Sequence, residues 1–157
     1  MSRSSPHETD RIGIFECTWK RHGEFAGDIG RLNLDTDTWV ALKMLMRRAA
    51  AGTVRLDEWE YPCASSRGAI GELKHHEECE VTAIKADRAV PESATVHYRV
   101  YFAEPAVSPE ELWALGMGAK SWHPDFVGTN QQDDIELAMG RANTTTPQGV
   151  ELLTFSP

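Results

Sequence analysis

The stretch TVHYRVYFA, residues 95–103, gives the clearest strand signal in the chain. Its apolar side chains occupy every second position: Val96, Tyr98, Val100 and Phe102. Successive side chains of a strand point to opposite faces, so the other face of this strand carries His97, Arg99 and Tyr101. The sequence therefore predicts a strand that packs one face on an apolar core.

Strand-like composition also marks several runs on either side of this stretch. Three of them, 54–61, 69–75 and 80–85, are separated by Gly, Ser, Pro or Asp residues. Consecutive strands of this kind predict an antiparallel sheet of about four or five strands. Near the ends of the chain, 11–19 predicts a further strand, and 150–155 predicts a short added strand or a docked tail.

Two segments have the periodicity of helices. The first, 38–51, follows several possible N-caps, ends before Gly52 and carries this apolar stripe: Trp39, Leu42, Leu45, Met46 and Ala49. The second, 130–142, follows a cap at Thr129 or Asn130 and carries this stripe: Ile135, Ala138, Met139 and Ala142. Acidic residues in the first turn of the second segment suit the helix dipole.

Glycine-rich segments separate these elements. The segment 23–30 contains three glycines and predicts a loop. The segment 108–111 has the pattern of a helix start, but Gly116 and Gly118 follow it closely. We therefore expect a single turn there that leads into a strand over 112–120.

Together these elements predict one α+β domain over 11–157, in which helices 38–51 and 130–142 pack on an antiparallel sheet. The polar segment 1–10 has no apolar core, so it predicts a disordered tail rather than a signal peptide. No run approaches the roughly 20 apolar residues of a membrane span. Three widely spaced cysteines, Cys17, Cys63 and Cys79, are typical of reduced thiols in a cytoplasmic protein.

The charge balance restricts the classes of ligand. The chain has 16 Lys and Arg against 24 Asp and Glu, a formal charge of −8. Such a balance favours solubility and opposes loose binding to nucleic acid. A function directed at RNA must therefore rest on a local cluster of cations.

Common cofactor and metal motifs are missing from the sequence. It contains no phosphate-binding loop, no dinucleotide fingerprint and no nucleophile elbow. The segment HHEEC, residues 75–79, is the one metal-like cluster, but adjacent histidines of a strand point to opposite faces. We therefore expect a solvated turn at 75–79 and no metal or cofactor.

Four short motifs occur in the chain in a fixed order. They are GELK at 71–74, HYRVY at 97–101, LWALGMGAK at 112–120 and IELAMGR at 135–141. This order resembles the RelE/HigB family of toxin ribonucleases within the RelE/ParE superfamily, over about residues 39–141. The resemblance implies a RelE-like core at 39–142, with a C-terminal extension at 143–157.

The resemblance also implies a function. It is that of a cytoplasmic, bacterial or phage-derived toxin of a toxin–antitoxin system, a metal-independent endoribonuclease that cleaves mRNA on the ribosome and is neutralised by an antitoxin protein. The acidic balance leaves an alternative open: a non-enzymatic, protein-binding module on the same fold, including one that inhibits gyrase. A third alternative is a scaffold protein unrelated to the family.

The candidate catalytic residues follow from the chemistry and from the resemblance. Metal-free RNA cleavage needs a base, an acid and cations that stabilise charge at the phosphate. Arg99 suits the last role, because its guanidinium can bind phosphate through two hydrogen bonds. The resemblance adds Lys74 and Lys120 as cations, and His123 and Asp125 in the region of the acid–base residues.

Each of these side chains also has a purely structural interpretation. Arg99 can be solvated or paired with Glu72, and Lys74 can pair with Glu72 or Glu104. His97 and Tyr101 can be cross-strand packing partners. The chain also departs from the family: Gly71 and Glu72 replace lysines, and the last helix has no counterpart of the terminal tyrosine, unless Phe126 marks its place.

Overall fold

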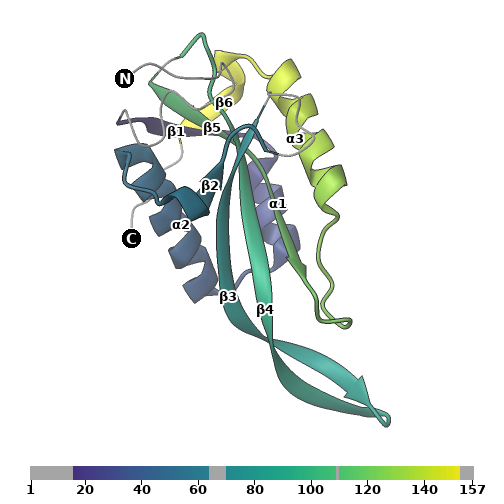
Figure 1. Ribbon diagram of the computed structural model, residues 1–157. Helices are drawn as coiled ribbons and strands as arrows, with labels where there is room; N and C mark the ends of the chain where they lie inside the picture. Colours follow the sequence, from purple (N-terminus) through teal and green to yellow (C-terminus); the bar gives the residue numbers. More distant parts are fainter. Residues whose placement is uncertain (1–15, 64–69, 109, 153–157) are drawn as a thin grey trace.

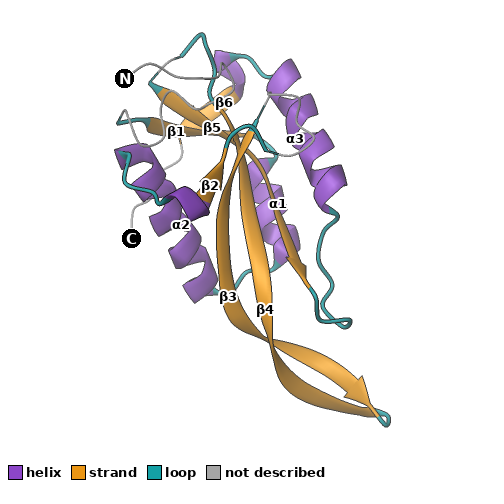
Figure 2. Cartoon of the chain, in the orientation of Figure 1, coloured by secondary structure: helices purple, strands orange, loops and turns teal. Residues whose placement is uncertain are grey.

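The computed structural model describes residues 16–63, 70–108 and 110–152. The elements follow in this order: β1 (Thr18–His22), α1 (Phe25–Leu32), α2 (Thr36–Ala51), β2 (Trp59–Glu60), β3 (Gly71–Lys85), β4 (Arg88–Ala103), β5 (Glu111–Ser121), α3 (Gln131–Thr144) and β6 (Val150–Leu152). Short 3₁₀ turns at Leu56–Glu58 and Pro147–Gly149 precede β2 and β6. The mixed α+β architecture is confirmed (Figures 1 and 2). In the described part of the chain, no helix is long and apolar enough to cross a membrane.

The six strands form one sheet in the order β2-β3-β4-β5-β1-β6. The expectation of four or five strands, all antiparallel, was wrong, because β1 pairs with β5 in parallel. The other neighbouring strands are antiparallel. Two helices lie between β1 and the rest of the sheet in sequence, and a connection of that length allows a parallel pair.

Helices cover both faces of this sheet (Figure 1). On one face, α1 and α2 pack on the apolar side of β4, with these fully buried side chains: Phe25, Leu42, Leu45, Met46, Val100 and Phe102. On the other face, Ile135 and Ala138 of α3 pack with Trp113, Leu115 and Tyr101. The face of β4 that the sequence predicts to be polar is therefore partly covered, and Tyr101 is only 1% exposed.

The two predicted helices are confirmed, each with its cap. The carboxylate of Asp35 accepts a hydrogen bond of 2.7 Å from the Thr38 N–H, so α2 begins two residues before the predicted 38–51. It ends at Gly52, whose φ of 78° favours glycine. The side chain of Asn130 accepts from the Asp133 N–H, and α3 runs to Thr144.

The N-terminal predictions need correction. Segment 23–30 is not a loop, because most of it lies in α1. Phe25, Ile29 and Leu32 recur at helical spacing and pack on the core, which offsets the low helix propensity of the glycines. The strand expected at 11–19 is displaced to β1. Residues 11–15, like the tail predicted at 1–10, lie outside the described residues.

The central predictions also change. The runs expected at 69–75 and 80–85 belong to one strand, β3, so the turn expected at 75–79 is wrong. Its polar side chains have cross-strand partners: Glu78, for example, accepts from the Ser93 hydroxyl at 2.9 Å. In the run 54–61, where a strand is expected, Leu56–Glu58 form a 3₁₀ turn and only Trp59–Glu60 form a strand, β2. The Glu58 carboxylate accepts a hydrogen bond from the backbone N–H of Arg55.

The remaining strands agree better with the predictions. The strand expected at 112–120 is confirmed as β5, which ends at Ser121, and residue 109 of the turn expected before it lies outside the described residues. At 150–155 the structure has the short strand β6 over its first three residues, and 153–155 lie outside the described residues. Beyond these strands, β3 and β4 continue as a long twisted hairpin that projects from the body of the protein (Figure 2).

Candidate active site

Strand register brings several polar side chains to one face of the sheet. Lys74 on β3 is the direct partner of Arg99 on β4, and Arg99 is the partner of Gly118 on β5. One step along the strands, His76, His97 and Lys120 form the same kind of row. Residues two apart on a strand share a face, so these side chains form one group. Of the sequence-predicted residues, Arg99, Lys74 and Lys120 are thus brought together.

A cleft of about 460 Å³ is lined by part of this group and also by His75 and Arg48, which come from the other side of the sheet. Its side chains are all polar. Its cations are Lys74 and Arg99 from the sheet, Arg48 from the last turn of α2, and Arg55 from the segment after α2. Two carboxylates, Asp57 and Glu58, and three histidines complete the lining. We call the cleft that these residues line the cationic cleft. It is a local excess of cations on an acidic chain.

Three of these cations are paired with carboxylates, and Arg55 Nε lies 3.4 Å from Asp57 Oδ1. Arg48 donates two hydrogen bonds, of 2.7 and 2.8 Å, to Glu58. These bonds lower the pKa of the Glu58 carboxyl to about 2, so it is ionised at neutral pH. Lys74 Nζ lies 3.7 Å from Glu60 Oε2, and its positive charge also acts to lower the pKa of the expected partner Glu72. Arg48 and Lys74 both line the cleft.

Arg99 has a weaker partner. Its Nε lies 3.7 Å from Glu72 Oε2, beyond hydrogen-bond distance, and among the described residues this is its one ion pair. Glu72 is buried, and its Oε2 has no hydrogen-bond partner in the described part of the chain. Burial raises the pKa of the Glu72 carboxyl, Arg99 opposes this, and a hydrogen bond with Glu60 raises the pKa further. The Arg99 guanidinium therefore lies close to the Glu72 carboxylate but makes no hydrogen bond to a described residue.

His97 lies at the centre of the group. Burial lowers its pKa, and the positive charges of Arg99, His76 and Lys120 lower it further. The imidazole is therefore neutral at pH 7, and a neutral imidazole can accept a proton. The His76 and His97 rings lie 5.8 Å apart between centroids. His97 lines both the cationic cleft and a shallow recess beside it.

The recess contains an acid that the sequence analysis did not single out. Asp134, in the first turn of α3, lies directly over Gly118, where a side chain would collide with its carboxylate. Burial raises the pKa of Asp134, whereas a hydrogen bond of 2.5 Å from the Thr129 hydroxyl lowers it. Asp134 and Arg99 both line this recess. Gly118 was the sequence signal that could have identified this contact, since a glycine in the middle of a strand indicates that another part of the chain lies close to the strand.

His123 and Asp125 lie elsewhere. His123 Nε2 is 2.9 Å from Glu92 Oε1 on the projecting part of β4, and its Nδ1 accepts from the Asp125 N–H. Glu92 is seven residues from Arg99 and, by alternation along β4, faces the opposite side. The structure therefore does not bring these two predicted residues to the cationic cleft.

Comparison with known proteins finds no matching family model, no similar curated protein and no similar solved structure. Within the residues that the structure describes, no group of three or more His, Cys, Asp and Glu side chains could hold a metal ion. The site pairs cations, which suit an oxyanion, with a neutral imidazole and a half-buried carboxyl group.

Proposed function

We propose that this protein is a metal-independent endoribonuclease, a RelE/HigB-like toxin that cleaves mRNA on the ribosome and is neutralised by an antitoxin protein. One observation carries the proposal: Arg99 lies on a sheet face between Lys74, His97 and Lys120, in a cleft, without a hydrogen bond to any described residue. An unsaturated guanidinium among other cations is suited to a phosphate group.

The order of the elements also supports the proposal. The resemblance leads us to expect a helix, a short antiparallel sheet and a C-terminal helix, and α2, β3–β5 and α3 follow in that order. Its four motifs fall on β3, β4, β5 and α3. Two of them, at 71–74 and 97–101, contain the paired Lys74 and Arg99.

The geometry suggests a role for each group in the reaction. His97 takes the proton of the 2′-hydroxyl, and the freed 2′-oxygen attacks the adjacent phosphorus. The bond from phosphorus to the 5′-oxygen breaks, and that oxygen takes a proton from solvent. The products are a 2′,3′-cyclic phosphate and a free 5′-hydroxyl. Arg99 and Lys74 stabilise the negative charge that develops on the phosphate oxygens.

The net charge of the chain favours a substrate RNA that is already held in place by another assembly. A protein of −8 gains little from long-range attraction to RNA. Recognition must then come from contacts made inside the cleft, on RNA that another assembly holds in place. This is our reason for proposing mRNA on the ribosome as the substrate.

A second candidate function rests on a different observation. All four cations of the cleft have a carboxylate within 4 Å: Arg48 with Glu58, Arg55 with Asp57, Lys74 with Glu60, and Arg99 with Glu72. Such pairs weaken a catalytic cation but suit a polar protein interface. The alternative is therefore a non-enzymatic, protein-binding module on the same fold.

The two candidates separate in one experiment. We expect the purified protein to cleave an mRNA during translation, with cut sites mapped by primer extension, and Arg99→Ala to reduce cleavage roughly 10²-fold or more. Arg99→Lys should restore only part of the activity, since an ammonium lacks the forked geometry. Arg88→Ala, at the exposed base of the hairpin tip, is the matched control and should cleave normally.

Two outcomes would contradict the ribonuclease proposal. One is a folded wild-type protein that leaves the mRNA intact, which would favour the protein-binding module. The other is full cleavage by a folded Arg99→Ala variant, which would remove Arg99 from the site. Thermal melts of all three variants beside the wild type show whether each protein is folded.

A further inference from the structure

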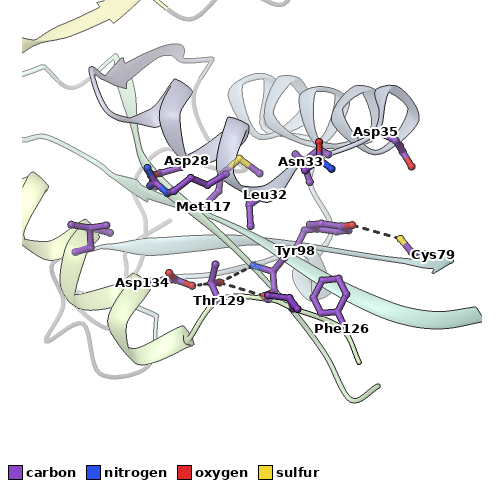
Figure 3. Close-up of a pocket in the computed structure, with 18 of the residues that line it drawn as sticks. Asp28, Leu32, Asn33, Asp35, Cys79, Tyr98, Met117, Phe126, Thr129 and Asp134 are labelled. Carbon is purple, nitrogen blue, oxygen red and sulfur yellow. Dashed lines mark hydrogen bonds and ion pairs between the residues drawn. The ribbon is translucent and has the colours of Figure 1, made fainter. Parts of the chain in front are cut away.

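A second cleft, of about 530 Å³, lies between α1 and α3 at the edge of β5 (Figure 3). Its walls include these apolar side chains: Leu32, Leu34, Met117, Phe126, Val127 and Leu137. Val127 is 94% exposed and Leu137 is 48% exposed, so apolar surface continues onto the rim. Clefts of about 300–1,000 Å³ with apolar walls and a few polar groups suit small molecules.

The floor of this cleft is a short stretch of open strand edge. β1 pairs with β5 only as far as Ala114. Beyond it, the Leu115 carbonyl accepts a hydrogen bond of 2.7 Å from Arg141. At Ala119, the backbone N–H donates to the Thr129 hydroxyl at 3.0 Å and the carbonyl accepts from the Thr129 N–H at 2.7 Å. Both ends of this edge are therefore occupied.

Met117 lies between these two positions. Alternate residues of an antiparallel strand direct their N–H and C=O groups toward the same edge. Since Ala119 directs both groups away from β4, Met117 does the same, and Met117 lines the cleft. The cleft floor thus presents one backbone donor and one backbone acceptor, close together.

The length of the open edge identifies the kind of ligand. An added peptide strand needs several consecutive residues, and the contacts at Leu115 and Ala119 leave only Met117. A single donor–acceptor pair instead matches a ring or amide that carries an acceptor and an N–H side by side. The rings of Tyr98 and Phe126 line the same cleft and favour a flat ligand (Figure 3).

The charges of the lining residues restrict the class of ligand further. The lining carboxylates Asp35, Glu80 and Asp134 face one lining cation, Arg31, which is already paired with Asp28. An anionic ligand would meet repulsion at this site, whereas a neutral ligand would not. Phosphorylated molecules are therefore disfavoured.

We propose that this cleft is a binding site for small, flat, uncharged molecules of the lactam and nucleobase class, which bind the N–H and C=O of Met117. The site is separate from the cationic cleft, and Asp134 lies between the two because it lines both this site and the recess beside Arg99. Its occupant would contact α1, α3 and the β5 edge together.

The test is an NMR titration of the full, ¹⁵N-labelled chain with 2-pyridone. We expect saturable shifts of the Met117 amide and its neighbours, with a Kd of roughly 0.1–1 mM, as befits a ligand of so few atoms. N-methyl-2-pyridone lacks the donor and should bind about 10-fold more weakly, because the Met117 carbonyl loses its partner. The carboxylated analogue, 6-hydroxynicotinate, should also bind more weakly.

A variant locates the binding to this cleft. Leu137→Trp should fill the space from the exposed face of α3 and abolish the shifts, whereas Met44→Trp, on the exposed face of α2, should leave them unchanged. Absence of shifts at Met117, equal binding of the N-methylated ring, or undiminished binding to Leu137→Trp would each overturn the proposal. The comparison of the two pyridones uses the unmodified protein and does not depend on the folding of any variant.

Discussion

Replacement of Arg141 by methionine should destabilise the fold more than any exposed substitution. Arg141 is 9% exposed and reaches from α3 across β5 to α1. One of its terminal nitrogen atoms, Nη1, lies 2.6 Å from the Asp28 carboxylate and 2.7 Å from the Leu115 carbonyl. Methionine keeps much of the aliphatic stem, so the loss is mainly that of the charge and its hydrogen bonds.

The size of the destabilisation depends on the charge that stays buried after Arg141 is removed. Breaking a buried ion pair costs about 3–5 kcal/mol, because one charge stays buried without its partner. Asp28 keeps its contact with Arg31, which places the cost near the lower end of this range. Loss of the bond to the Leu115 carbonyl adds about 1 kcal/mol. We expect a total of about 3–4 kcal/mol, and a decrease in Tm of roughly 10 °C for a chain of this size.

Urea unfolding at pH 7 measures this difference, and Arg21→Met provides the matched control. Arg21 pairs with Glu151 at 3.1 Å, but both side chains are substantially exposed. Such a pair is worth less than about 1 kcal/mol. If Arg141→Met costs no more than Arg21→Met, the buried pair does not stabilise the packing of α1 and α3. A double-mutant cycle with Asp28→Asn isolates the pairwise term.

Two further predictions concern the sheet. The raised pKa of Glu72 means that the folded state holds this proton to higher pH than the unfolded state, so its contribution to stability falls as pH rises above the ordinary value near 4.5. Glu72→Gln should remove this decrease, and thermal melts from pH 4 to 8 would detect it; a slope unchanged by the substitution would contradict the assignment. Gly118→Ala should destabilise the protein by about 1–3 kcal/mol and displace Asp134, with Gly140→Ala, at an open position on α3, as control. Equal melting temperatures for these two variants would show that α3 moves freely to accommodate the added methyl group.

The parts of the fold that sequence patterns predict are those with a strong local signal. Helix α2 has a cap, an apolar stripe and a terminal glycine, and it appears within two residues of its expected start. The alternation in β4 likewise predicts its buried face. Helix α1 was missed because its glycines suggest a loop, and only contact with the core outweighs their propensity.

The site was predictable to a smaller extent. Arg99, Lys74 and Lys120 were placed together by strand alternation and by the resemblance, and strand register brings them onto one face. His123 followed from sequence proximity to Lys120, but the chain turns after Ser121 and carries it toward Glu92. The place of Asp134 depends on how α3 crosses β5, and the one local signal of that crossing is the glycine at position 118.

The projecting hairpin of β3 and β4 has a consequence for hydrogen exchange. β2 pairs with β3 only at residues 72–73, and β5 ends opposite Val96, so residues 80–93 form a ribbon of two strands. Ribbon amides exchange after a local opening that starts at the tip, where Ala86 and Asp87 have positive φ. Amides near Val100 sit at the centre of the sheet and exchange only through much larger openings. The single strand β4 therefore contains both amides of low local stability, near the tip, and amides of high local stability, near Val100. The contact between His123 and Glu92 links the outer part of β4 to the segment after β5.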